Sequence, residues 1–101
     1  MRESTKQTIA PLLGALRSYA MLEEVREAEF YLRGRDFVHF HETADGVIAD
    51  VLLAKGRVSM PVRDPSEQAE LLERIESRLS SLEEHAKHRQ GRKKKRRGAY
   101  D

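Results

Sequence analysis

The middle third of the chain, residues 28 to 62, carries short alternations of hydrophobic and polar positions that predict β-strands. We expect strands at residues 29–33, 37–41, 47–53 and 57–62, separated by turns rich in Gly and Asp. Asp45 and Gly46 suit the positive φ angles of a tight hairpin between the second and third strands. Pro61 lacks an amide donor, which favours an edge position for the last strand. The simplest arrangement is a four-stranded antiparallel meander.

The segment from residue 37 to residue 41 predicts a sheet whose two faces differ. Side chains alternate between faces along a strand, so Phe37, His39 and His41 are expected on one face. Val38 and Phe40 are then expected on the other. The pattern therefore predicts one apolar face, covered by helices, and one face that carries two imidazoles.

A first helix is predicted over residues 4 to 25, where apolar residues recur at spacings of three and four. Pro11 fits only the first turn of a helix, which favours a start close to Thr8; an earlier turn kinked at Pro11 is the alternative. Residues 21 to 27 are compatible with an extension of this helix or with an approach to the first strand.

A second helix is predicted to begin at Asp64 and Pro65, because Asp64 can cap the first turn and Glu67 follows at the spacing of a capping box. Its apolar stripe is expected to pack on the domain's own sheet, and a homodimer formed through this helix is the alternative. The stripe contains Ala69, Leu71, Leu72, Ile75, Leu79, Leu82 and Ala86. The predicted fold class is therefore α+β.

Length and composition restrict the class of protein. A chain of 101 residues supports one domain, and the absence of cysteine excludes disulfides and thiolate chemistry. The apolar runs fall far short of the ~20 residues that cross a bilayer, and no signal-type segment begins the chain. We therefore expect a cytoplasmic protein. No nucleotide-binding, hydrolase or zinc-helix motif is present, so no cofactor is predicted from motifs.

Charge is distributed unevenly along the chain. Residues 1 to 86 carry 11 Lys and Arg against 16 Asp and Glu, a net charge of −5, whereas residues 87 to 101 carry 8 against 1, a net charge of +7. We expect a single domain over residues 1–86 and a disordered tail over residues 87–101. The cationic side chains of the tail are Lys87, Arg89, Arg92, Lys93, Lys94, Lys95, Arg96 and Arg97.

Such a tail favours binding of nucleic acid or another polyanion by counterion release, and a solubilising tail without a dedicated partner is the alternative. Because the body of the protein is acidic, this binding is expected from the tail, without a large basic face on the domain. The favoured function is therefore a non-enzymatic binding module whose tail engages a polyanion.

The alternative function uses His39 and His41, whose Cα atoms stand ~7 Å apart at the i, i+2 spacing of a strand. Both rings can reach one transition metal from such positions, with Asp50, Glu42 or Asp45 as a further ligand or outer partner. The same pair also suits general acid–base catalysis, or two ordinary half-buried sheet residues. Whether the protein is an enzyme stays open at this stage.

The run from residue 29 to residue 41, Glu-Phe-Tyr-Leu-Arg-Gly-Arg-Asp-Phe-Val-His-Phe-His, followed by Ala49 and Asp50, resembles a family of small uncharacterised prokaryotic proteins labelled luciferase-like. The resemblance covers residues 28 to 82 and aligns His39 and His41 with the family's His-x-His pair. The family's helix-bearing insert is replaced here by residues 51–56. The resemblance implies a compact α+β domain, and it does not carry light emission over to this protein.

Overall fold

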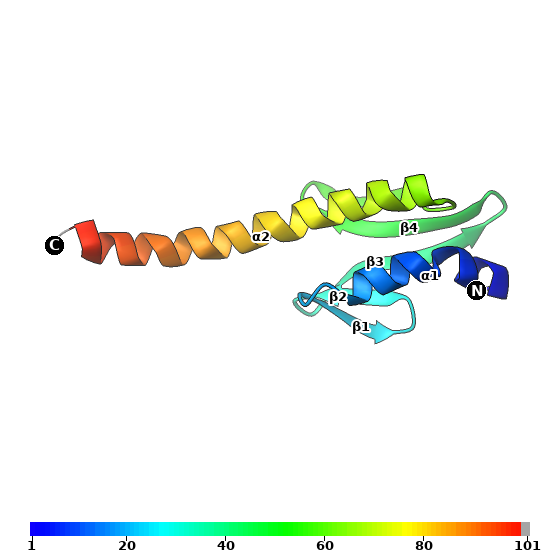
Figure 1. The fold of residues 1–101 in the computed structure, drawn as a ribbon, viewed down its shortest axis with the longest axis horizontal. Helices are drawn as coiled ribbons and strands as arrows, with labels where there is room; N and C mark the ends of the chain where they lie inside the picture. The colour runs from blue at the N-terminus through cyan, green and yellow to red at the C-terminus, as the bar shows by residue number, and fades with distance from the viewer. Residues whose placement is uncertain (100–101) are drawn as a thin grey trace.

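A computed structural model of the chain describes the backbone of residues 1–99 and the side chains of residues 1–83. It contains two helices and five strands (Figure 1). In chain order these are α1 (Glu3–Arg17), β1 (Leu22–Arg26), β2 (Glu29–Leu32), β3 (Arg35–Thr43), β4 (Gly46–Leu53), β5 (Gly56–Pro61) and α2 (Pro65–Ala99). The predictions about the side chains of residues 87 to 101 lie outside the described residues, and the disorder expected for this segment stays a prediction.

The five strands form one antiparallel sheet in the order β1-β2-β3-β4-β5, which confirms the predicted meander and the edge position of the strand that ends at Pro61. The sheet has five strands where four were predicted. The additional strand, β1, pairs with β2 through residues such as Glu23, opposite Tyr31. It lies at the other edge and buries little surface, so its sequence lacks the hydrophobic alternation that marks the inner strands.

The first helix begins earlier and ends earlier than the sequence predicted. It starts at Glu3, and the hydroxyl of Thr8 donates to the carbonyl of Ser4 at 2.9 Å instead of capping the helix. Pro11 therefore lies inside the helix, where its ring removes one hydrogen bond. Pro11 and Gln7 are both exposed, so water can satisfy the Gln7 carbonyl that the ring leaves unpaired.

The second helix begins as predicted. Pro65 is its first residue, and the amide of Glu67 donates to Oδ1 of Asp64 at 2.9 Å. The carboxylate of Glu67 accepts hydrogen bonds from the amide and the guanidinium of Arg63. These contacts satisfy amides of the first turn and fix the direction in which α2 leaves β5.

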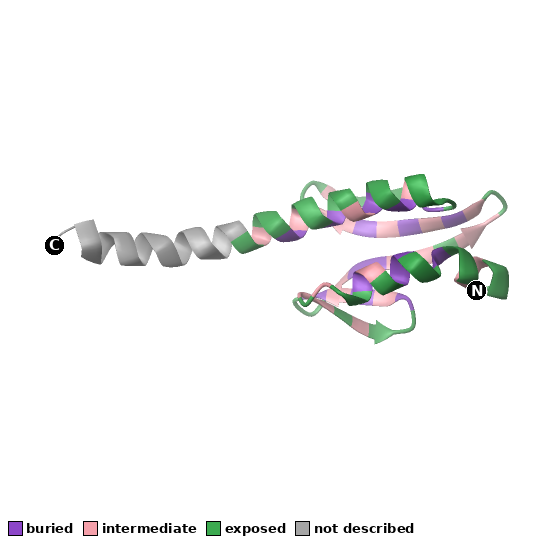
Figure 2. Ribbon diagram, in the orientation of Figure 1, coloured by how far each residue is buried: buried purple, intermediate pink, exposed green. Residues whose placement is uncertain are grey.

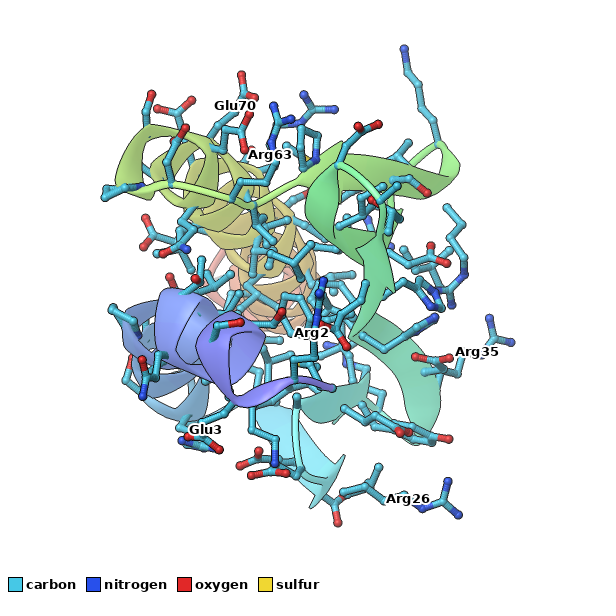
Figure 3. The ribbon with its side chains drawn as sticks, turned by 90° about the vertical axis from the view of Figure 1, so that its right-hand side faces the viewer. Arg2, Glu3, Arg26, Arg35, Arg63 and Glu70 are labelled. Atoms are coloured by element: carbon cyan, nitrogen blue, oxygen red, sulfur yellow. The ribbon has the colours of Figure 1, made fainter. Side chains whose placement is uncertain are left out.

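Both helices cover the same face of the sheet, as the end-on view makes plain (Figure 3). The buried positions of the helices face the sheet and their outer surfaces are exposed (Figure 2). Leu71, Ile75 and Leu79 of α2 are buried in this core, which confirms that this part of the apolar stripe packs on the domain's own sheet. At the ends of the predicted stripe, Ala69 is exposed and the side chain of Ala86 lies outside the described residues. In the part of the chain that the structure describes, neither helix is long and apolar enough to cross a membrane.

A β-bulge in β3 corrects the predicted faces of the sheet. Phe30 of β2 pairs with Val38, but the next residue, Tyr31, pairs with Asp36, so Phe37 has no partner on β2. Phe37 and Val38 are both buried in the core, at 1% and 0% exposure. The prediction that Phe37 shares a face with the histidines was therefore wrong, because two consecutive side chains at the bulge point toward the helices.

Candidate metal centre

The sheet face opposite the helices carries the two histidines that the sequence singled out. His39 and His41 project from β3, and Asp50 projects from β4 directly opposite His39. Facing residues of antiparallel strands share a face of the sheet, so the register brings the carboxylate to the imidazoles. The predicted hairpin and its polar face are both confirmed at this point.

The three side chains converge on one point. Nε2 of His39 lies 3.4 Å from Oδ2 of Asp50, and Nε2 of His41 lies 3.7 Å from the same oxygen. The two imidazole centroids are 4.7 Å apart and the rings are nearly perpendicular. One ligand atom from each residue lies within 4.8 Å of the other two. A tetrahedral zinc site separates its ligand atoms by about 3.4 Å, so small rotations of the side chains bring these three into coordination range.

Asp36 and Arg57 surround this cluster. Oδ1 of Asp36 lies 3.3 Å from Nδ1 of His39, the ring nitrogen that faces away from Asp50. Nη1 of Arg57 lies 3.6 Å from Oδ1 of Asp50, and its other terminal nitrogen donates to the Asp36 carbonyl at 2.9 Å. Metal-binding histidines usually donate their second N–H to a carboxylate or carbonyl, which fixes the tautomer. Asp36 is in position to play this part for His39.

The cluster has a net negative charge when its imidazoles are neutral, because Asp36 and Asp50 outnumber Arg57. A cation placed among the three ligand atoms would neutralise part of this charge. The exposure of the side chains falls from 55% for His41 to 24% for His39 and 20% for Asp50. The site is thus accessible from solvent on one side and supported by the sheet on the other.

The two other carboxylates considered from the sequence lie elsewhere. Glu42 accepts hydrogen bonds from Thr5 and Arg2 at the start of α1, and these bonds lower the pKa of Glu42 to about 2. Asp45 lies in the turn between β3 and β4, where its amide donates to the hydroxyl of Thr43. Of the predicted acidic residues, only Asp50 joins the histidines within the described part of the chain.

Sequence reasoning did not assign Asp36 and Arg57 to the site. Asp36 precedes His39 by three positions, and simple alternation places two such residues on opposite faces. The bulge at Phe37 reverses this relationship, and no sequence signal in the chain marks the bulge. Arg57 reaches the site from β5, and only the register of β4 with β5 reveals that proximity.

The fold and the site define an α+β domain with a solvent-accessible His-His-Asp cluster on the sheet face opposite the two helices. Among known proteins, no family model, curated protein or solved structure matches the chain. The resemblance to the luciferase-like family therefore stays a prediction.

Proposed function

We propose that this protein binds a divalent transition metal, with zinc as the best match, through His39, His41 and Asp50. The observation that carries the proposal is the convergence of two imidazole nitrogens and one carboxylate oxygen within 4.8 Å of one another. Imidazole and carboxylate are common zinc ligands, and sites with three protein ligands leave a fourth position for water or another molecule. The charge pattern of the sequence favours the tail as the functional part, whereas the geometry of the site supports the histidine alternative better.

The surroundings of the three ligands support binding over enclosed catalysis. Asp36 contacts Nδ1 of His39, the ring nitrogen that faces away from Asp50. Arg57 contacts Oδ1 of Asp50, the carboxylate oxygen that faces away from the histidines. These contacts restrict the rotation of two of the three ligands. More than half of the His41 side chain is exposed, whereas enzyme sites usually exclude water from the reacting groups. We propose a metal-binding domain and assign no reaction to it.

Zinc binding to the untagged full-length protein tests the proposal. The unmodified protein is expected to bind one equivalent of zinc, measured by titration calorimetry and by competition with a chromophoric chelator. Zinc at about 100 times its dissociation constant is expected to stabilise the fold by about 2.7 kcal/mol, seen as a rise in Tm. His39→Ala combined with His41→Ala should abolish both effects.

The chain contains its own matched control, because two of its four histidines lie outside the cluster. His85→Ala combined with His88→Ala removes the same number of imidazoles from a different segment. This variant is expected to retain full zinc stoichiometry. Equal zinc binding by the two double variants would refute the proposed site.

A second proposal concerns the basic tail, which the charge distribution favours. Residues 92 to 97 are six consecutive cations, and we propose that residues 87 to 101 engage nucleic acid in the cytoplasm by neutralising phosphates. Removal of residues 87–101 is expected to abolish retention on immobilised nucleic acid at low salt while changing Tm little. Undiminished retention of the truncated protein would contradict the proposal.

Dimerisation through α2 also stays a proposal, and it predicts a doubled mass in solution.

A further inference from the structure

The cations of the domain divide into two groups by their partners. Eleven Lys and Arg occur among residues 1 to 83, and six of them have a carboxylate within 4.0 Å. Within residues 1 to 83, no carboxylate comes within that distance of the other five. These five are Arg33, Arg35, Lys55, Arg74 and Arg78.

The five cations without such a partner lie together. Arg33, Arg35 and Arg78 line an open cavity of about 210 Å³ between the β2–β3 turn and α2. Lys55, Arg74 and Arg78 line a second open cavity of about 410 Å³ between the β4–β5 turn and α2. Arg78 belongs to both, so the two cavities form one surface. We call these five residues the basic end of the domain.

The topology explains why these residues meet. In a meander, alternate turns lie at the same end of the sheet, so the β2–β3 and β4–β5 turns are neighbours. Arg33 and Gly34 both have positive φ, the conformation of a tight two-residue hairpin, and the turn carries Arg33 and Arg35 at the end of the sheet. Helix α2 starts near the opposite end and passes over these turns (Figure 1).

The basic end is also close to the start of the cationic tail. Lys87 follows Arg78, the last residue of the basic end along the chain, by nine positions, which is about 14 Å along the axis of α2. The local excess of positive charge is hidden in the sequence because the domain as a whole is acidic. It appears in the structure because the other six cations among residues 1 to 83 each have a carboxylate within 4.0 Å.

We propose that the basic end is a docking surface for the phosphate backbone of nucleic acid. The bound strand continues from there along residues 87 to 101. The inference rests on the nucleic-acid function proposed for the tail. Four of the five residues are arginine, whose planar guanidinium binds phosphate oxygens in pairs. Ser77 and Ser81 line the larger cavity and add hydroxyl donors.

The contacts of the basic end favour nucleic acid over a membrane surface. Arg33, Arg35, Lys55 and Arg74 are exposed, and Figure 3 shows the Arg35 side chain extending away from the body of the domain. They bind phosphate without first breaking an ion pair within the described residues. The large apolar side chains that are exposed in residues 1–83 are Met1, Val25 and Val58, and only Val58 borders the basic end. A membrane-docking surface would need more apolar side chains to enter the bilayer.

The test compares two full-length variants of equal net charge. Arg74→Gln with Arg78→Gln removes two cations of the basic end, whereas Lys6→Gln with Arg26→Gln removes two ion-paired cations elsewhere. Binding to a short oligouridine RNA and to a short DNA duplex is measured by fluorescence anisotropy across a salt titration. For the RNA, the slope of log affinity against log salt is expected to fall by about 1.4 in the first variant and to change little in the second. Equal changes in both variants would overturn the inference, because only net charge would then matter.

Further arms separate this inference from the proposal about the tail. Lys93→Gln, Lys94→Gln and Lys95→Gln in the full chain test the tail alone. If this variant loses affinity while the basic-end variant matches its control, the docking surface is refuted and the tail proposal stands. If the unmodified protein binds neither the RNA nor the DNA, both the docking surface and the tail proposal are refuted. If it binds only to vesicles of phosphatidylserine, both are refuted as well. Melting curves for every variant confirm that each remains folded.

Discussion

Nδ1 of His39 lies 3.3 Å from Oδ1 of Asp36, although three positions separate these residues on one strand. On a regular strand the two side chains would lie on opposite faces of the sheet. The bulge turns Phe37 toward the core and leaves Asp36 on the side of the histidines. A packing feature of the core thus determines which carboxylate contacts the outer nitrogen of His39.

This relationship predicts the effect of Asp36→Asn on the metal site. The amide retains the size of the carboxylate but loses its charge, so it holds the metal-binding tautomer of His39 less firmly. Zinc affinity is expected to fall by about 10- to 100-fold, with an unchanged Tm in the absence of metal. Titration calorimetry measures the change. Asp45→Asn alters the same charge in the β3–β4 turn and should leave zinc affinity at its original value; equal losses in both variants would exclude the role of Asp36.

The bulge also predicts how far Phe37→Ala lowers the free energy of unfolding. Phe37 is 1% exposed, so truncation leaves a cavity in the core and should lower the free energy of unfolding by about 3–5 kcal/mol. Phe40→Ala is the matched control. Because Phe40 is only partly buried, its truncation should lower the free energy of unfolding by less. Urea denaturation measures both. A cost for Phe37→Ala no greater than that for Phe40→Ala would argue against the bulged arrangement.

The inner part of the sheet could be predicted from the sequence because its signals are local. The apolar run over residues 47 to 53 and the Asp45–Gly46 turn define the central hairpin, and the hairpin register brings Asp50 to the histidines. The cap at Asp64 likewise depends on residues that are close in sequence.

The rest of the fold and of the candidate site depends on interactions between residues that are distant in sequence. The edge strand β1 is stabilised by pairing with β2 and by little burial of its own, so its composition is that of a polar connection. Pro11 inside α1 is tolerated because that side of the helix faces water, and a helix-breaking rule cannot anticipate this. The bulge at Phe37 and the approach of Arg57 likewise follow from strand pairing.

Gln68 predicts a further effect on stability. Its side-chain amide is buried and donates to the carbonyls of Thr8 at 2.9 Å and Val62 at 3.0 Å, so it links α1 to the start of α2. Gln68→Ala leaves the buried Val62 carbonyl without this donor, and the free energy of unfolding should fall by about 1–3 kcal/mol. Gln7→Ala removes an exposed amide from α1 and should change stability little. Similar values for the two variants, measured by urea denaturation, would contradict the linking role of Gln68.

Glu42 predicts how acid affects the packing of α1 against the end of β3. Hydrogen bonds from Thr5 and Arg2 lower the pKa of Glu42 from 4.5 to about 2, so the unfolded chain takes up this proton first as the pH falls. The ionised carboxylate therefore stabilises the fold above pH 4.5, and the contribution is lost as the pH falls toward about 2.

Glu42→Gln tests this contribution, because the amide oxygen still accepts hydrogen bonds but carries no charge. The variant should melt at a lower temperature than the unmodified protein at neutral pH. The difference in Tm should shrink steadily below pH 4.5 and approach zero only below about pH 2, where the carboxyl group becomes protonated in the folded state as well as in the unfolded state. Since Arg2 is exposed, added salt should reduce the neutral-pH difference as well. A difference in Tm that stays constant across this range would show that the charge of Glu42 is not what stabilises the contact.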